Sequence, residues 1–87
     1  MTFDNVQQAA ATLGFHHHHL LTARRLGCVS FRNGRVYSAG LVEWIGENVS
    51  RINEATWAEK ITPEMVAAAK VRLEQVEASL KARRAAR

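Results

Sequence analysis

Small and apolar residues recur at helical spacing near the start of the chain. Ala9, Ala10 and Leu13 lie three or four positions apart, so they share one face of a helix predicted over residues 5–12. The polar residues of the same segment fall mostly on the other faces, which suits contact with water. The segment is therefore predicted to be an amphipathic helix that contributes its apolar face to a core.

A second helix is predicted over residues 17–26, where Leu20 and Ala23 face the same core. Gly14 can supply the positive φ of a tight turn before this helix, and Gly27 can end it. Two helices joined by so short a turn are typical of a helix-turn-helix. The open alternative is an ordinary corner between two helices in a small helical protein.

Capping residues mark three helix starts. Thr2 or Asp4 is a candidate cap of the first helix, and Gln7, three residues after Asp4, completes a pattern like a capping box. Ser38 is the predicted cap of a third helix. Thr62-Pro63 places a capping hydroxyl before a proline at the first helical position of the last helix.

Residues 29–37 are predicted to form a short β-wing. Apolar and polar residues alternate in its first strand, which is the period of a half-buried strand. Asn33-Gly34 is a preferred pair for a two-residue type I′ hairpin turn. Arg32 and Arg35 flank this turn, so the tip of the wing is expected to be basic.

The segment after the wing has a broad apolar face that predicts the third helix. This helix is expected to end between Asn48 and Asn53, and residues 49–60 either continue it or break it. Trp57 in that stretch is either a packing residue or part of an interface. The apolar face comprises Leu41, Val42, Trp44, Ile45 and Val49.

The last helix is predicted over residues 63–84 and carries a narrow apolar stripe with alternating spacings of 3 and 4. Such a stripe is typical of a short coiled coil, which predicts a homodimer through this helix. The alternative is that the stripe packs on the core of its own domain. The candidate dimerisation residues are Val66, Ala69, Leu73, Val76 and Leu80.

A chain of 87 residues can build one domain with a modest core, and it is short for a large active-site cleft. The predicted fold is mainly α with a small β-hairpin: a winged helix-turn-helix followed by a long C-terminal helix. The predicted divisions are residues 1–53 for the winged helix-turn-helix, 54–62 for a linker or helix extension, and 63–87 for the C-terminal helix with its basic tail.

The net charge of +4 is distributed unevenly along the chain. Residues 1–37 carry four arginines against one aspartate, for a charge of +3, whereas residues 38–80 carry four bases against seven acids, for −3. Residues 81–87 carry four bases. A basic region that coincides with the helix-turn-helix favours double-stranded DNA as a partner, because phosphate neutralisation supplies most non-specific affinity. A charge that serves only solubility is the alternative.

The residue inventory argues against an enzyme, a cofactor or a metal site. Asp4 is the only acid before Glu43, and no glycine-rich phosphate loop is present. Cys28 has no second cysteine, and His16 and His19 have no acid or cysteine at ligand spacing. No stretch approaches the roughly 18 apolar residues of a membrane span, and no secretion signal is evident, so we expect a cytoplasmic protein.

A helix-turn-helix, an Asn-Gly wing and a helix with a Glu-Trp pair follow one another in VQQAAATLGFHHHHLLTARRLG and VSFRNGRVYSAGLVEWIGEN. Over residues 5–50 this order resembles the excisionase/MerR-like winged helix-turn-helix superfamily. Among small phage-type proteins, the layout is similar to phage excisionases and to the N-terminal DNA-binding domain of the small terminase subunit of lambda-like phages. The resemblance implies a phage- or plasmid-type regulator or DNA-packaging factor, with the second helix in the major groove and the wing on the backbone or minor groove.

The four histidines at positions 16–19 depart from the family pattern, in which this helix opens with serine or threonine and other polar residues. Neutral histidines attract phosphate weakly, and Leu21 places an apolar side chain on the expected outer face. The alternative function is therefore a phage protein that uses this scaffold to bind and inhibit a host protein. The candidate DNA-binding residues are His16, His17, His18, Thr22, Arg24, Arg25, Arg32, Asn33 and Arg35.

Overall fold

The computed structural model describes residues 1–85. It is mainly helical, with a small antiparallel sheet and a long C-terminal helix, which confirms the predicted fold class. Within the described residues the elements are β1 (Thr2–Phe3), α1 (Val6–Leu13), α2 (His17–Arg25), β2 (Phe31–Arg32), β3 (Arg35–Tyr37), α3 (Leu41–Glu47), α4 (Val49–Ala55) and α5 (Pro63–Ala85).

Helix α1 begins one residue later than the sequence predicted. Its N-cap is Asn5, whose side-chain oxygen accepts a hydrogen bond from the backbone N–H of Gln8 at 2.8 Å. The Gln8 side chain accepts in return from the backbone N–H of Asp4 at 2.7 Å. The predicted pair Asp4 and Gln7 thus does not cap α1; Asn5 and Gln8 form a similar reciprocal pair, in which Gln8 accepts from the residue before the N-cap.

The turn between α1 and α2 consists of Gly14, Phe15 and His16. Gly14 has a φ of +85°, as its position in a tight turn predicted, and its N–H donates to the carbonyl of Ala10 at 2.8 Å. Phe15 returns to the core, where it is buried. The two helices pack against each other, so the helix-turn-helix arrangement predicted from spacing is present.

The sheet has the strand order β1-β3-β2, with both pairs antiparallel. The predicted wing is its β2–β3 hairpin, and Asn33 and Gly34 have φ values of +53° and +77°, as a type I′ turn requires. Strand β1 was not predicted, and it places Phe3 opposite Val36 in the core. Val29 was expected in the first wing strand, but it lies in the preceding turn and is exposed.

Residues 41–55 form two helices that meet at Asn48. The Asn48 side chain donates to the carbonyl of Trp44 at 2.8 Å, which caps the end of α3. The predicted cap Ser38 does not serve α3, because the N-cap is Gly40 in a left-handed conformation. Of the predicted apolar face, Leu41, Val42 and Ile45 are buried, whereas Trp44 and Val49 are only partly buried. The third helix breaks at Asn48, and a separate helix, α4, covers Val49–Ala55 of the segment 49–60 that the sequence left open.

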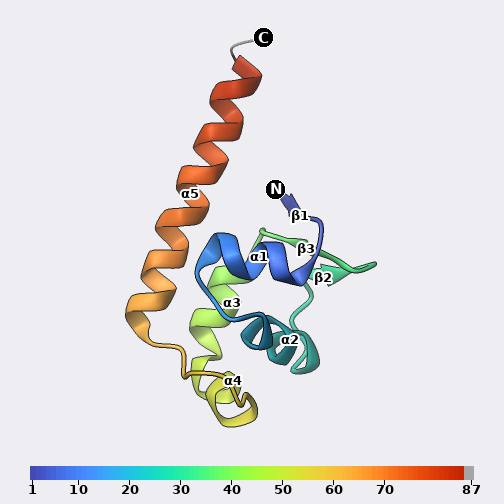
Figure 1. Ribbon diagram of the computed structural model, residues 1–87, viewed down its shortest axis with the longest axis vertical. Coiled ribbons are helices and arrows are strands. Elements are labelled where there is room, and N and C mark those ends of the chain that lie inside the picture. The colour runs from blue at the N-terminus through green and yellow to red at the C-terminus, as the bar shows by residue number, and fades with distance from the viewer. Residues whose placement is uncertain (86–87) are drawn as a thin grey trace.

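Helix α5 begins as predicted, since the Thr62 hydroxyl accepts a hydrogen bond from the N–H of Met65 at 3.2 Å. Its first half packs against α1 and α3, where Ala69 is fully buried and Val66 and Leu73 contact the core. Its C-terminal end extends beyond the rest of the molecule (Figure 1). The first three residues of the predicted dimerisation stripe therefore pack within their own chain.

One core joins most of the elements, since it includes Phe3 from β1, Ile52 from α4, Ile61 from the α4–α5 loop and Ala69 from α5. The segment expected as a linker thus contributes to the core through Ile61. In Figure 1 the wing and α5 lie on opposite sides of this core, and α2 lies near the end that is remote from the C-terminus. This arrangement leaves α2 and the wing uncovered by α5.

Candidate nucleic-acid interface

Histidines cap the start of α2 in place of the serine and glutamate of an ordinary capping box. The Nδ1 atom of His16 accepts a hydrogen bond from the N–H of His18, and the Nδ1 atom of His19 accepts one from the N–H of His16, both at 3.1 Å. His19 is buried, and its Nε2 atom donates to the carbonyl of Glu59 in the α4–α5 loop. The histidine run therefore stabilises the helix start and ties it to a distant loop.

The rings of His16, His17 and His18 lie against one another, and those of His16 and His18 also lie against Trp57. His17 is 4.4 Å from both His16 and His18 between ring centroids, and His18 is 3.9 Å from Trp57. Desolvation lowers the pKa of His18 below its ordinary value, and positive charge on its histidine neighbours lowers that pKa further. The cluster therefore disfavours protonation of His18, which reduces its value as a phosphate contact.

Thr22 is not available for base contact, contrary to the sequence prediction. Its residue is only 4% exposed, because it lies on the inner side of α2 with Ala23. The sequence prediction took Leu20 and Ala23 as a narrow inner face of α2, which left Thr22 on the outer face. In the structure His19 is buried as well, so the inner face is wider than predicted. The outer face of α2 therefore carries Leu21 and the two arginines.

Arg24 and the wing lie at one hollow of the surface. Arg24 comes from the last turn of α2, and it lines this hollow together with Arg32, Asn33 and Gly34 from the wing. Both arginines and Asn33 are exposed. The structure thus brings together residues from the two elements that the sequence predicted to contact DNA.

Arg25 and Arg35 extend the basic surface on either side of this hollow. Arg25 lines a different hollow, beside His18 and Trp57, so α2 separates two depressions of the surface. Arg35 stands opposite Arg32 across the β2–β3 hairpin. All four predicted arginines are exposed, which leaves their guanidinium groups free to meet an anionic partner.

Trp57 is the prominent surface residue whose role the sequence left open. It is 75% exposed, far more than Trp44, which packs partly against the core. The sequence does not predict this exposure of Trp57, because a lone tryptophan in a short polar segment is as common in packing as in interfaces. Its position beside α2 depends on how α4 and the following loop pack against that helix.

No protein-family model, curated protein or solved structure matches this chain. Among the residues that the structure describes, no helix is both long and apolar enough to cross a membrane.

Proposed function

We propose that this chain is a small DNA-binding protein of the winged helix-turn-helix type, with α2 in the major groove and the wing on the backbone or minor groove. The observation that carries the proposal is the shared hollow lined by Arg24 of α2 and by Arg32 and Asn33 of the wing. A recognition helix and a wing must reach one duplex together, so their residues have to lie on one face. The role would be that of a phage- or plasmid-type regulator or packaging factor, acting in the cytoplasm.

The four exposed arginines would supply most of the affinity by contacting phosphates, and this contribution does not depend on sequence. Arg24 and Arg25 lie in the last turn of α2, where positive side chains also interact favourably with the helix dipole. Base contacts would come from the remaining outer residues of α2, including His17. The buried Thr22 has no part in this account.

Loss of the two wing arginines tests the proposal. The double variant Arg32→Ala/Arg35→Ala should weaken binding to duplexes of any sequence, because two phosphate contacts disappear. The slope of the logarithm of affinity against the logarithm of salt concentration should decrease by about two. Fluorescence anisotropy of a labelled random-sequence duplex, recorded over a salt series, measures both quantities.

A matched control removes the same charge from another surface. Lys60 in the α4–α5 loop and Lys70 on α5 are exposed, so Lys60→Ala/Lys70→Ala lowers the net charge by the same two units. This variant should bind the duplex nearly as the wild type does. An equal loss of duplex affinity in both variants would show that net charge governs binding and that the position of the basic residues does not. That result would overturn the assignment of the wing to DNA binding.

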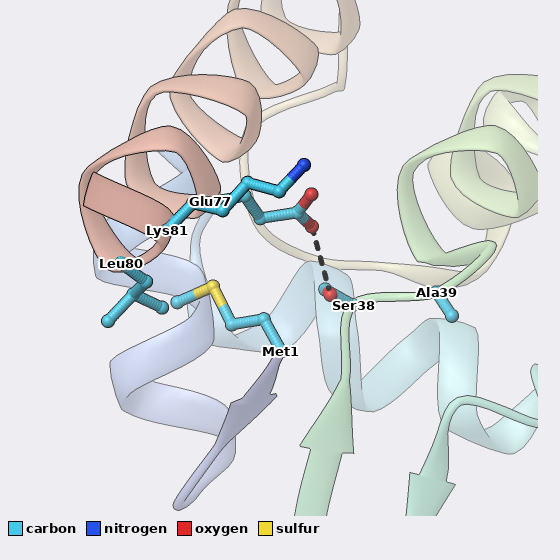
Figure 2. A pocket seen from close by; sticks show the side chains of 6 residues that line it. All are labelled: Met1, Ser38, Ala39, Glu77, Leu80 and Lys81. Carbon is cyan, nitrogen blue, oxygen red and sulfur yellow. Dashed lines mark hydrogen bonds between the residues drawn. The ribbon is translucent and has the colours of Figure 1, made fainter. Parts of the chain in front are cut away.

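We propose further that the chain forms a homodimer through the second half of α5. Val76 and Leu80 continue the stripe beyond the residues that pack on the core, and both are only half-buried. Figure 2 shows Leu80 beside Met1 at a shallow hollow between α5 and the sheet, which Ser38, Ala39, Glu77 and Lys81 also line. A second copy could cover this apolar surface and present two α2 helices to neighbouring half-sites.

A second candidate function is inhibition of a host protein through the same scaffold. It is favoured by the exposure of two apolar side chains on one side of α2, Leu21 at 36% and Trp57 at 75%. Aromatic residues of this kind often dominate protein interfaces. A folded wild-type chain that fails to bind duplex DNA at low salt, and instead binds one purified host protein, would support this candidate over DNA binding.

A further inference from the structure

Trp57 stands beside a small hollow on the side of α2 that faces away from the wing. The hollow has a volume of about 220 Å³ and is lined by His18, Leu21, Thr22, Arg25, Ala55 and Trp57. This volume is below the roughly 300 Å³ at which sites for drug-sized ligands begin. The hollow therefore suits one flat ring system better than a larger ligand.

The segment that carries Trp57 is fixed on both sides of this residue. Before it, the Thr56 hydroxyl accepts a hydrogen bond from the N–H of Ala58 at 3.2 Å. After it, Ile61 is buried and exchanges two hydrogen bonds with the Asn53 side chain, at 2.8 and 3.0 Å. Trp57 is thus held in an exposed position by an ordered loop, and a preorganised aromatic side chain loses little entropy on binding.

His19 anchors the same loop from the side of α2, because its Nε2 atom donates to the carbonyl of Glu59. The His18 ring packs against the Trp57 indole at a centroid distance of 3.9 Å and an angle of 54° between the ring planes. One face of the indole is therefore supported by His18. Stacking on a supported aromatic ring is the usual way in which proteins hold an unpaired base.

The charge of the hollow favours a nucleotide over an apolar peptide. The cationic side chain in its wall is Arg25, which is exposed, and no acidic residue of the described chain lines it. An arginine beside an aromatic ring can pair with phosphate while the base stacks. The site also continues the basic outer face of α2, to which Arg24 belongs.

We propose that Trp57 and His18 form a stacking site for one unpaired nucleobase, with Arg25 placed to contact the phosphate of that nucleotide. This inference rests on the proposed function in one respect, which is that the partner is nucleic acid. The stacking site would bind a single strand, whereas α2 and the wing would bind a duplex. It gives the protein a means of holding a strand that has left the helix next to a bound duplex.

The test is a fluorescence titration of the full chain with single-stranded oligothymidylate. Tryptophan emission should be quenched as a base stacks on Trp57, and Trp57→Ala should abolish the quenching and lower the affinity by about tenfold. Trp57→Phe keeps an aromatic face and should recover most of the affinity, though its emission then comes from Trp44 and does not report on the stacking site. Trp44→Phe is the matched control, because it leaves Trp57 as the sole tryptophan and should retain the quenching.

A parallel titration with a blunt random-sequence duplex separates this inference from the proposed function. Trp57→Ala should bind the duplex within about twofold of the wild type, while the wing variant binds it weakly. Duplex binding without quenching by oligothymidylate would overturn the stacking site alone. Quenching by oligothymidylate without duplex binding would overturn the proposed function alone, and binding to neither would overturn both in favour of a protein partner for Trp57.

Discussion

His19 joins two parts of the molecule through its two ring nitrogens. Its Nδ1 atom accepts from the backbone at the start of α2, and its Nε2 atom donates to the α4–α5 loop. These roles define a neutral ring with the proton on Nε2, because a protonated imidazole has no acceptor. A single buried side chain thus stabilises the helix that we propose to enter DNA and the loop that presents Trp57.

Acidification should therefore destabilise the protein. Desolvation and then the charges of its histidine neighbours lower the pKa of His18, so the folded chain takes up protons less readily than the unfolded chain. The free energy of unfolding should fall as the pH drops below about 6.5, the ordinary value for histidine, because the unfolded chain then binds protons more readily than the folded one. Thermal unfolding followed by circular dichroism at pH 7.5 and pH 5.5 measures the difference.

The variant His18→Gln provides the matched control, because it removes the group whose pKa is lowered. A glutamine amide remains polar beside Trp57 but does not titrate in this range. Its loss of stability between pH 7.5 and pH 5.5 should be smaller than that of the wild type. The same loss in both proteins would exclude His18 as a source of the pH dependence.

At the scale of elements, α5 is attached to α1 through Arg72 and Gly14. The Arg72 guanidinium donates to the carbonyl of Leu13 at 3.2 Å, where α1 ends and its exposed carbonyls favour a positive charge. Gly14 leaves room for this contact, since a Cβ atom there would clash with the Arg72 Nη1 atom. The missing side chain thus allows both the turn and the hydrogen bond from Arg72 to the carbonyl of Leu13.

Gly14→Ala should lower the free energy of unfolding by about 1–2 kcal/mol for its positive φ and by roughly another 1 kcal/mol because Arg72 must leave Leu13. Gly40→Ala is the control, because Gly40 has a φ of +73° but has open space around its Cβ position. Urea denaturation should show the larger loss for Gly14→Ala. Equal losses would mean that the Arg72 contact adds nothing to stability.

Elements with strong local signals could be predicted from the sequence, and those that depend on distant partners could not. Asn33-Gly34 and Thr62-Pro63 specify a turn and a helix start through their own backbone preferences, and both predictions were confirmed. Strand β1 has two residues and exists only because β3 pairs with it. The burial of Thr22 likewise depends on what packs against α2. The candidate site was thus predictable in its arginines, whereas the position of Trp57 required the tertiary structure.

The whole molecule separates two basic regions. The arginines of α2 and the wing lie on elements that α5 does not cover, and the basic end of α5, which includes Lys81 and Arg83, extends away from them (Figure 1). The acidic middle of the chain supplies α3, α4 and the first part of α5.

Dimerisation through α5 can be tested without disturbing the core. Leu80→Glu should shift a dimer to a monomer, because it places a charge at the end of the apolar stripe that does not pack on the core. The equivalent change at Leu73 is less informative, because Leu73 packs against the core of its own chain. Val71→Glu is the control, since Val71 is 51% exposed and lies off the stripe. Sedimentation equilibrium of the three proteins measures the change, and a monomeric wild type at high micromolar concentration would contradict the proposed dimer.

The central claim is that α2 and the wing form one DNA-binding face. Its most direct test is a titration of the isotope-labelled chain with a random-sequence DNA duplex, followed by two-dimensional NMR of the backbone amides. We predict that the amide shifts change most at residues 21–25 and 31–35, with smaller changes along α5. Shifts confined to the second half of α5, or no shifts at low salt in a folded protein, would contradict the claim.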